Sequence, residues 1–233
     1  MKQEHKAMND WRTFILASLG LSLITACKPS ITTDIYTTDL EKIIEKAEQV
    51  IFVPAEIGIP IQNADKCDQE SAKMVPILAK YDPHLKFKEC VDLKKEVYDM
   101  MMFITEIPIT DRSGYEDKTP GFFGVTIKKD EERKLNHVFL VKTENTDLAV
   151  KEIDSIYQFQ KMKLEDIVIN IGINNDSRES KEIVLSGVFY NAEPVDMSRT
   201  FEIDRRERGK IIPSDVKSKS ILTENFTHIL SMK

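Results

Sequence analysis

The sequence is poor in the residues and motifs on which most metal and nucleophile sites depend. Its 233 residues include four histidines and three cysteines, and no HExxH, CxxC or G-x-S-x-G segment occurs. The absence of these motifs argues against a zinc protease, a cysteine-based zinc site and a serine hydrolase of the common types. Carboxylates are plentiful, but a sequence does not show whether two of them converge as in a glycosidase. The motifs therefore predict no catalytic residue, no metal site and no cofactor.

An excess of positive charge and a long apolar run are missing as well. The chain has 33 basic and 39 acidic side chains, a net charge of −6, so it offers no electrostatic reason to bind nucleic acid. Its main apolar stretch, Phe14–Ala26, is shorter than the roughly 20 residues that a membrane-spanning helix needs. This stretch therefore requires a different explanation.

The N-terminus has the order of zones that is typical of an export signal. Residues 1–12 are polar and carry three basic side chains, residues 14–26 are apolar, and the small residue Ala26 precedes Cys27. This order predicts a secretory signal peptide over residues 1–26. Translation from Met8 would preserve the same order, and the alternative is a buried apolar helix that ends at a cysteine by chance.

The segment Ile24-Thr25-Ala26-Cys27 resembles the lipobox of bacterial lipoproteins. The resemblance implies that the Cys27 thiol receives a diacylglycerol and that Cys27 becomes the first residue of the mature chain. Two acyl chains are enough for stable attachment to a membrane. Lys28 stands where an aspartate favours inner-membrane retention in enteric-type bacteria, so the resemblance implies the outer membrane, on its periplasmic face.

Cys67 and Cys90 remain once Cys27 carries the lipid. An even pair in an oxidising compartment predicts a disulfide. It would close a loop of about 24 residues and contribute roughly 3 kcal/mol in the chain-entropy description. A metal site that adds His84, or two free thiols, are the alternatives.

The remaining pattern predicts an α+β body, with a mainly antiparallel sheet and a few packed helices. The polar segment 110–121 is rich in turn residues and divides the body into an N-terminal subdomain, 27–112, and a C-terminal subdomain, 121–233. Helices are expected over 38–49, where Thr38 and Glu41 form a capping box, over 65–81, in a short segment after Asp92 that includes Met100 and Met101, from Thr146 to Tyr157, and after Ser214. Strands are expected over 30–37, 50–59, 85–91, 103–109, 123–127, 135–141, 167–173, 183–189, 201–203, around Ile211 and over 226–232.

Three of these expectations are specific enough to fail. The alternation at Ile167, Ile169, Ile171 and Ile173 predicts a strand with one buried face, in a continuous sheet spanning much of the C-terminal half. Residues 201–203 and Ile211 should form a hairpin across the charged turn at 205–209. His137 should lie on the apolar side of its strand, as a packed residue.

The mature N-terminus resembles small phage and prophage lipoproteins, on the basis of its Thr/Asp-rich strand directly after the lipid cysteine, the helix that follows and the cysteine pair. Some phage lipoproteins block an outer-membrane receptor. We therefore expect a non-enzymatic binding or accessory protein, held on the membrane by lipid on Cys27 and contacting an envelope protein. The alternative is a periplasmic hydrolase whose carboxylates converge only in the fold.

Overall fold

The computed structural model describes residues 28–61, 64–92, 99–111, 121–156 and 167–233. The predicted signal peptide, Cys27 and most of the predicted boundary segment lie outside these ranges. Within the described ranges, no helix is long and apolar enough to cross a bilayer.

The described chain contains thirteen strands, four α-helices and a short 3-10 turn, η1 (Ala64–Lys66). The helices are α2 (Thr37–Ile44), α3 (Cys67–Tyr81), α4 (Glu144–Ile156) and α5 (Asp215–Thr223). The strands are β1 (Ser30–Tyr36), β2 (Val50–Ile61), β3 (Lys86–Val91), β4 (Asp99–Asp111), β5 (Phe123–Asp130), β6 (Leu135–Lys142), β7 (Val168–Asn174), β8 (Lys181–Leu185), β9 (Val188–Tyr190), β10 (Glu193–Val195), β11 (Arg199–Ile203), β12 (Arg208–Pro213) and β13 (Phe226–Met232). The mixture of helices with a large sheet confirms the predicted class at this level.

All thirteen strands join one sheet, in the order β10-β9-β12-β7-β1-β2-β4-β5-β6-β13-β8-β11, with β3 added beside β4. The pairs β1–β7 and β4–β5 are parallel, and the other pairs of the described strands are antiparallel. The first strand of the body, β1, therefore lies in the middle of the sheet, between β2 and β7. The sheet takes strands from both sides of segment 110–121. The division of the body into two subdomains at this segment stays a prediction.

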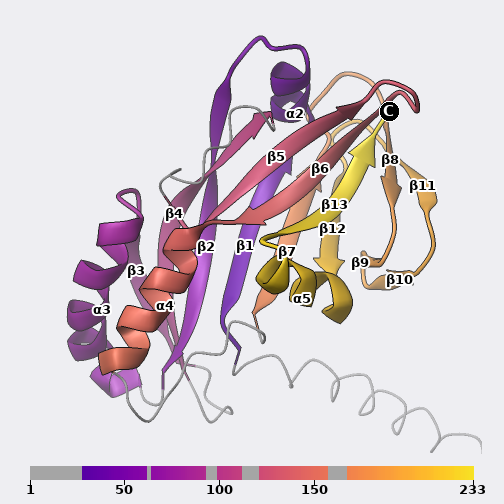
Figure 1. The fold of residues 1–233 in the computed structure, drawn as a ribbon. Helices are drawn as coiled ribbons and strands as arrows, with labels where there is room; N and C mark the ends of the chain where they lie inside the picture. The colour runs from indigo at the N-terminus through magenta and orange to yellow at the C-terminus, as the bar shows by residue number, and fades with distance from the viewer. Residues whose placement is uncertain (1–27, 62–63, 93–98, 112–120, 157–166) are drawn as a thin grey trace, which may run out of the picture.

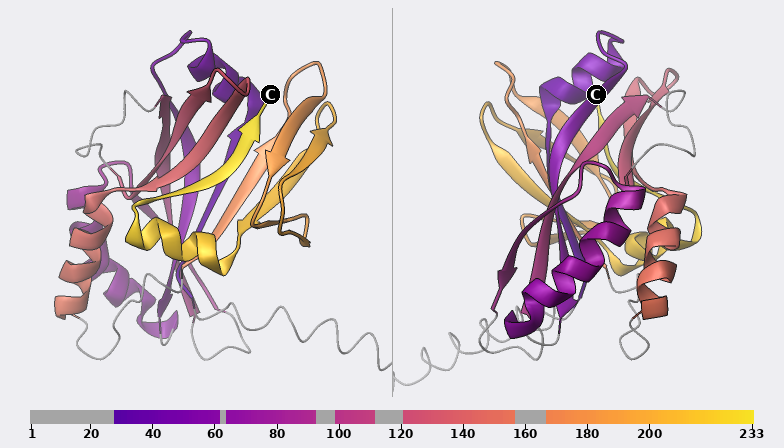
Figure 2. Two further views of the ribbon diagram at one scale, coloured as in Figure 1. Left: turned by 45° about the vertical axis from the view of Figure 1, so that its right-hand side comes forward. Right: turned by 90° about the vertical axis from the view of Figure 1, so that its left-hand side faces the viewer.

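The sheet curls until its two ends nearly meet (Figures 1 and 2). Tyr190 on β9 packs against Phe201 on β11, with ring centroids 4.8 Å apart. The Arg199 guanidinium carbon lies over the Phe201 ring, 4.8 Å from its centroid. Gly209 on β12 makes room for the Tyr190 ring, because a Cβ at that position would lie 2.4 Å from it.

The curled sheet encloses the core. Ile169, Ile171 and Ile173 of β7 are almost fully buried on one side of their strand, which confirms the prediction from their alternation. Figure 1 shows α2 at one end of the sheet and α3, α4 and α5 toward the other.

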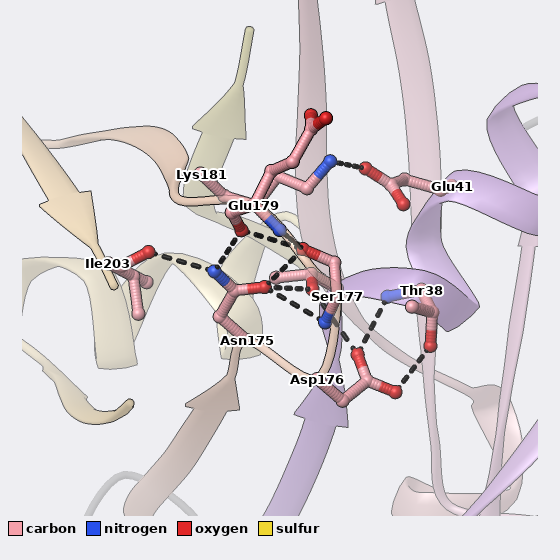
Figure 3. A network of polar contacts seen from close by, with 9 residues as sticks. Thr38, Glu41, Asn175, Asp176, Ser177, Glu179, Lys181 and Ile203 are labelled. Atoms are coloured by element: carbon pink, nitrogen blue, oxygen red, sulfur yellow. Dashed lines mark hydrogen bonds and ion pairs between the residues drawn. The ribbon is translucent and has the colours of Figure 1, made fainter. Parts of the chain in front are cut away.

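Helix α2 begins at a polar network that its own sequence does not supply (Figure 3). Asp176, 138 residues further along the chain, accepts hydrogen bonds from the Thr38 backbone N–H at 3.1 Å and from the Thr38 hydroxyl at 2.5 Å. The predicted capping box is therefore wrong, because a distant carboxylate satisfies the free N–H group of the first turn. The helix also ends earlier than predicted, at Ile44, since Lys46 adopts a left-handed conformation with φ 58°.

Asn175 holds the other half of this network, and its side chain is buried. Its amide donates to the carbonyl oxygens of Glu179 and Ile203, both at 2.8 Å, and its Oδ1 accepts from Thr37 at 3.1 Å. Asn175 thereby joins the ends of β7 and β11 to the start of α2.

The same region explains why the predicted hairpin over 201–211 is wrong. Strand β11 pairs with β8, whereas β12 pairs with β7 and β9. The intervening turn is tied to Asn175, whose backbone accepts from the Arg206 N–H and donates to the Glu207 carbonyl. The predicted continuous sheet of C-terminal strands is wrong for a related reason: β1, β2 and β4 separate β7 from β5.

The expected strand over 50–59 is confirmed by β2, which continues through Pro54; the Pro54 carbonyl oxygen accepts a hydrogen bond from Thr33. Two other local predictions fail. The expected strand over 183–189 breaks at Gly187, where φ is 62°. Met100 and Met101 lie in β4 and not in a helix, because both are paired with neighbouring strands; residues 93–98 lie outside the described ranges.

Candidate functional site

The structure brings the two predicted disulfide cysteines together. Cys67 begins α3 and Cys90 lies on β3, and their Cα atoms are 6.3 Å apart, a separation that a disulfide spans. His84, the third residue of the alternative metal site, lies instead beside Glu106, with Nδ1 3.2 Å from Oε2. The described residues contain no group of three His, Cys, Asp or Glu side chains suited to a metal ion. The oxidation state of the pair in the cell stays a prediction.

A second group of polar residues was not predicted from the sequence, and a β-bulge creates it. In β13, His228 is paired with Phe139 and Leu230 with Val138, so Ile229 is an extra residue between two successive pairs. Residues three apart on a regular strand point to opposite faces, and one extra residue reverses this. The bulge therefore places His228 and Ser231 on the same face, beside His137 of β6.

Ser231 lies between the two histidines. Its Oγ is 2.8 Å from His137 Nδ1 and 3.0 Å from His228 Nε2. On its far side, His137 Nε2 is 3.5 Å from Asp130 Oδ2 at the end of β5. A proton on His137 Nε2, facing the carboxylate, leaves Nδ1 to accept from the Ser231 hydroxyl, whose oxygen then accepts from His228 Nε2–H. Two hydrogen bonds thus link His137, Ser231 and His228, with the Asp130 carboxylate beside the other ring nitrogen of His137.

The electrostatic surroundings of His228 favour its neutral form. Burial, and next the charge of Lys217, lower the pKa of His228 from its ordinary 6.5 to about 4. Burial also lowers the pKa of Lys217 to about 8, while its ammonium group donates to the His228 carbonyl oxygen at 2.6 Å. On the far side of His137, a hydrogen bond from the Arg133 backbone N–H is the main cause that lowers the pKa of Asp130. At pH 7 we therefore expect an ionised Asp130 and a neutral His228.

Aromatic rings extend the cluster along the same face. Phe139 packs against Phe226 and His228, with ring centroids 6.0 and 5.4 Å apart, and the rings of His137 and His228 are 5.5 Å apart. Phe226 is 44 % exposed, and Phe139 is partly exposed. We call this surface of His137, Phe139, Phe226, His228 and Ser231 the β6–β13 face. Strands β6 and β13 lie side by side in Figure 1.

The order Asp130–His137–Ser231 is that of an acid, a base and a nucleophile. The serine, however, is only 3 % exposed and has an imidazole on each side of its oxygen. A substrate carbonyl would have to displace one of these rings before it reached Oγ. The arrangement is better suited to holding two histidines in fixed positions beside exposed aromatic rings than to nucleophilic attack.

Little in the sequence pattern indicates this face. His137 was predicted on the apolar side of its strand, but Val138 and Leu140 are the residues of β6 that face the core, so the predicted side is reversed. Both sets of alternate residues in β6 contain apolar side chains, and neither the bulge at Ile229 nor the pairing of β6 with β13 is visible in the pattern.

Comparison with known proteins finds one family. Residues 30–233 match the model of a family described as a domain of unknown function (DUF7424). No curated protein and no solved structure matches the chain.

Proposed function

The chain belongs to the DUF7424 family, whose description assigns no activity, and we propose that it is a lipid-anchored protein that binds an envelope protein without carrying out chemistry. The single observation that carries this proposal is the β6–β13 face. Its aromatic rings are partly exposed, and its serine is enclosed by hydrogen bonds. Aromatic side chains, phenylalanine included, are enriched in protein interfaces relative to the rest of the surface.

The lipobox-like segment that ends at Cys27 supports attachment to a membrane through lipid. Because Lys28 follows Cys27, the proposed location is the periplasmic face of the outer membrane. Strand β1 begins at Ser30, so the body is held close to that surface without a long tether. A prophage product that blocks a receptor is one form of this function.

Capture of the partner from native membranes tests the proposal. The full lipidated chain is cross-linked in its own cells, purified and compared with two variants: Phe139→Ser combined with Phe226→Ser, and Phe52→Ser as a matched control. Phe52 is 46 % exposed on β2, outside the β6–β13 face. We expect the wild-type chain and the control to capture the same envelope protein, and the double variant to lose it while its Tm remains close to that of the control.

Capture of the same protein by the double variant would exclude the β6–β13 face as the docking surface. Absence of any specifically cross-linked protein from the wild-type chain would contradict the binding function.

The order Asp130–His137–Ser231 favours a second candidate, a periplasmic hydrolase. A fluorophosphonate probe, which reacts with activated serines, distinguishes the two. Labelling of the native protein that is lost in Ser231→Ala would support the hydrolase, and an unlabelled native protein would support binding.

A further inference from the structure

An apolar cavity of about 50 Å³ lies between the helices α3 and α4 and the sheet. Its walls include Leu78 of α3, Leu85 ahead of β3, Phe123 of β5, and Ala149 and Ile153 of α4. Thr146 also borders the cavity, but its hydroxyl donates to the Phe122 carbonyl oxygen. A water molecule needs several polar partners, which such walls do not supply, so a hydrocarbon group is the chemically matched occupant.

The start of the described chain also borders this cavity. Pro29 and Ser30 line it, and a 2.8 Å hydrogen bond from the Val168 N–H to the Pro29 carbonyl oxygen fixes Pro29 beside β7. Cys27 precedes Pro29 by two residues, a span of at most about 7 Å. A lipid on Cys27 is therefore attached within easy reach of the cavity.

We propose that the cavity holds the end of one acyl chain carried by Cys27. The inference rests on the proposed lipidation, and it identifies the ligand as the protein's own lipid. The volume is sufficient for only the last few carbons of a chain, which would supply the van der Waals contacts that the walls of an empty cavity lack. The second acyl chain stays in the bilayer, so the α3–α4 end of the body is held toward the membrane surface.

Photo-cross-linking with photo-leucine tests the occupant without changing the shape of the protein. Cells that produce the full chain incorporate this leucine analogue and are irradiated. Each diazirine then loses N₂, and the resulting carbene inserts into a neighbouring C–H bond. Leu78 and Leu85 line the cavity, whereas Leu148 of α4 is 49 % exposed and serves as an internal control.

Mass spectrometry of the digested protein identifies what each leucine has reached. We expect peptides containing Leu78 or Leu85 to be joined to the N-terminal lipopeptide, and the Leu148 peptide to be free of it. Ala149→Leu, which fills the cavity, should abolish the product. Lys151→Leu, which adds the same side chain at an exposed position of the same helix, should retain it.

The other outcomes overturn the inference in distinguishable ways. A phospholipid joined to Leu78 or Leu85 would show that the bilayer, and not Cys27, supplies the chain. A lipidated Cys27 with no lipid product at either leucine would exclude the cavity as an acyl site and leave the anchor intact. An unmodified Cys27 would contradict the proposed anchoring itself.

Discussion

Replacement of Gly209 by alanine tests the seam that nearly closes the sheet. The new Cβ would lie 2.4 Å from both Cε2 and Oη of Tyr190 and 2.7 Å from Cζ. These are atoms of a rigid ring that is 8 % exposed and packs against Phe201. The ring must therefore move away from the seam.

The cost combines two effects. Overpacking of a well-filled site costs about 1–3 kcal/mol, and loss of an aromatic pair costs about 0.5–1.5 kcal/mol. We expect Gly209→Ala to lower the free energy of unfolding by about 2 kcal/mol. For a chain of this length, that change corresponds to a fall in Tm of about 4–8 °C, measured by circular dichroism.

Gly172→Ala is the matched control. Its Cβ would lie 1.8 Å from Asp34 Oδ1, but this atom ends a partly exposed side chain that can rotate away and give up its 2.8 Å contact with Arg208. Such a surface pair contributes about 0–1 kcal/mol, so the control should be the milder change. In a Tyr190→Leu background, Gly209→Ala should cost much less, since the ring is gone. Equal losses for the two glycine variants, or strict additivity with Tyr190→Leu, would refute the reasoning.

Four further outcomes are expected. Ile171→Asp should unfold the protein, because Ile171 is fully buried and pairs with Thr33 and Ile211. An uncompensated buried carboxylate costs several kcal/mol against a total stability of about 5–15 kcal/mol. An unchanged melting curve would contradict the burial of this side chain. Cys67 and Cys90 of protein from the envelope should alkylate only after reduction, as seen by intact mass, and ready alkylation without reductant would exclude the bridge. Cys27→Ser should abolish lipid labelling and signal cleavage, and a mutant that is still cleaved and membrane-bound would exclude the lipobox interpretation. The pKa of His228 is about 4 in the folded protein against an ordinary 6.5, so the unfolded chain binds the proton first as the pH decreases. The free energy of unfolding should therefore fall between about pH 6.5 and pH 4. His228→Gln should flatten this part of the Tm–pH curve, and an unchanged slope would show that other groups cause it.

The periodic parts of the fold could be predicted from the sequence. Strict alternation identified β7 and its buried isoleucines, because a strand with one buried face must repeat every two residues. The strand pairing could not be predicted in the same way. The charged residues at 205–209 have the composition of a hairpin turn, yet β11 and β12 lie in different parts of the sheet. Their turn is held by Asn175, a contact that a local pattern does not contain.

The candidate site was less predictable than the fold. Cys67 and Cys90 could be paired by elimination, since few cysteines are present. His137, His228 and Ser231 come together only through the pairing of β6 with β13 and the bulge at Ile229. Asp176 likewise caps α2 from a distance of 138 residues, where a local capping box had been expected.

The central position of β1 determines how the body would resist mechanical force. If Cys27 is anchored and a bound partner pulls on the body, the tension enters at Ser30 and runs along the axis of β1. All seven residues of this strand are paired in register with β7, from Ser30 beside Val168 to Tyr36 beside Asn174. A pull along the strand loads this row of hydrogen bonds together, in shear, whereas a pull at an edge strand would open them one at a time. With the proposed anchor at Cys27, the strand that first takes the load is therefore held along its whole length rather than at one end.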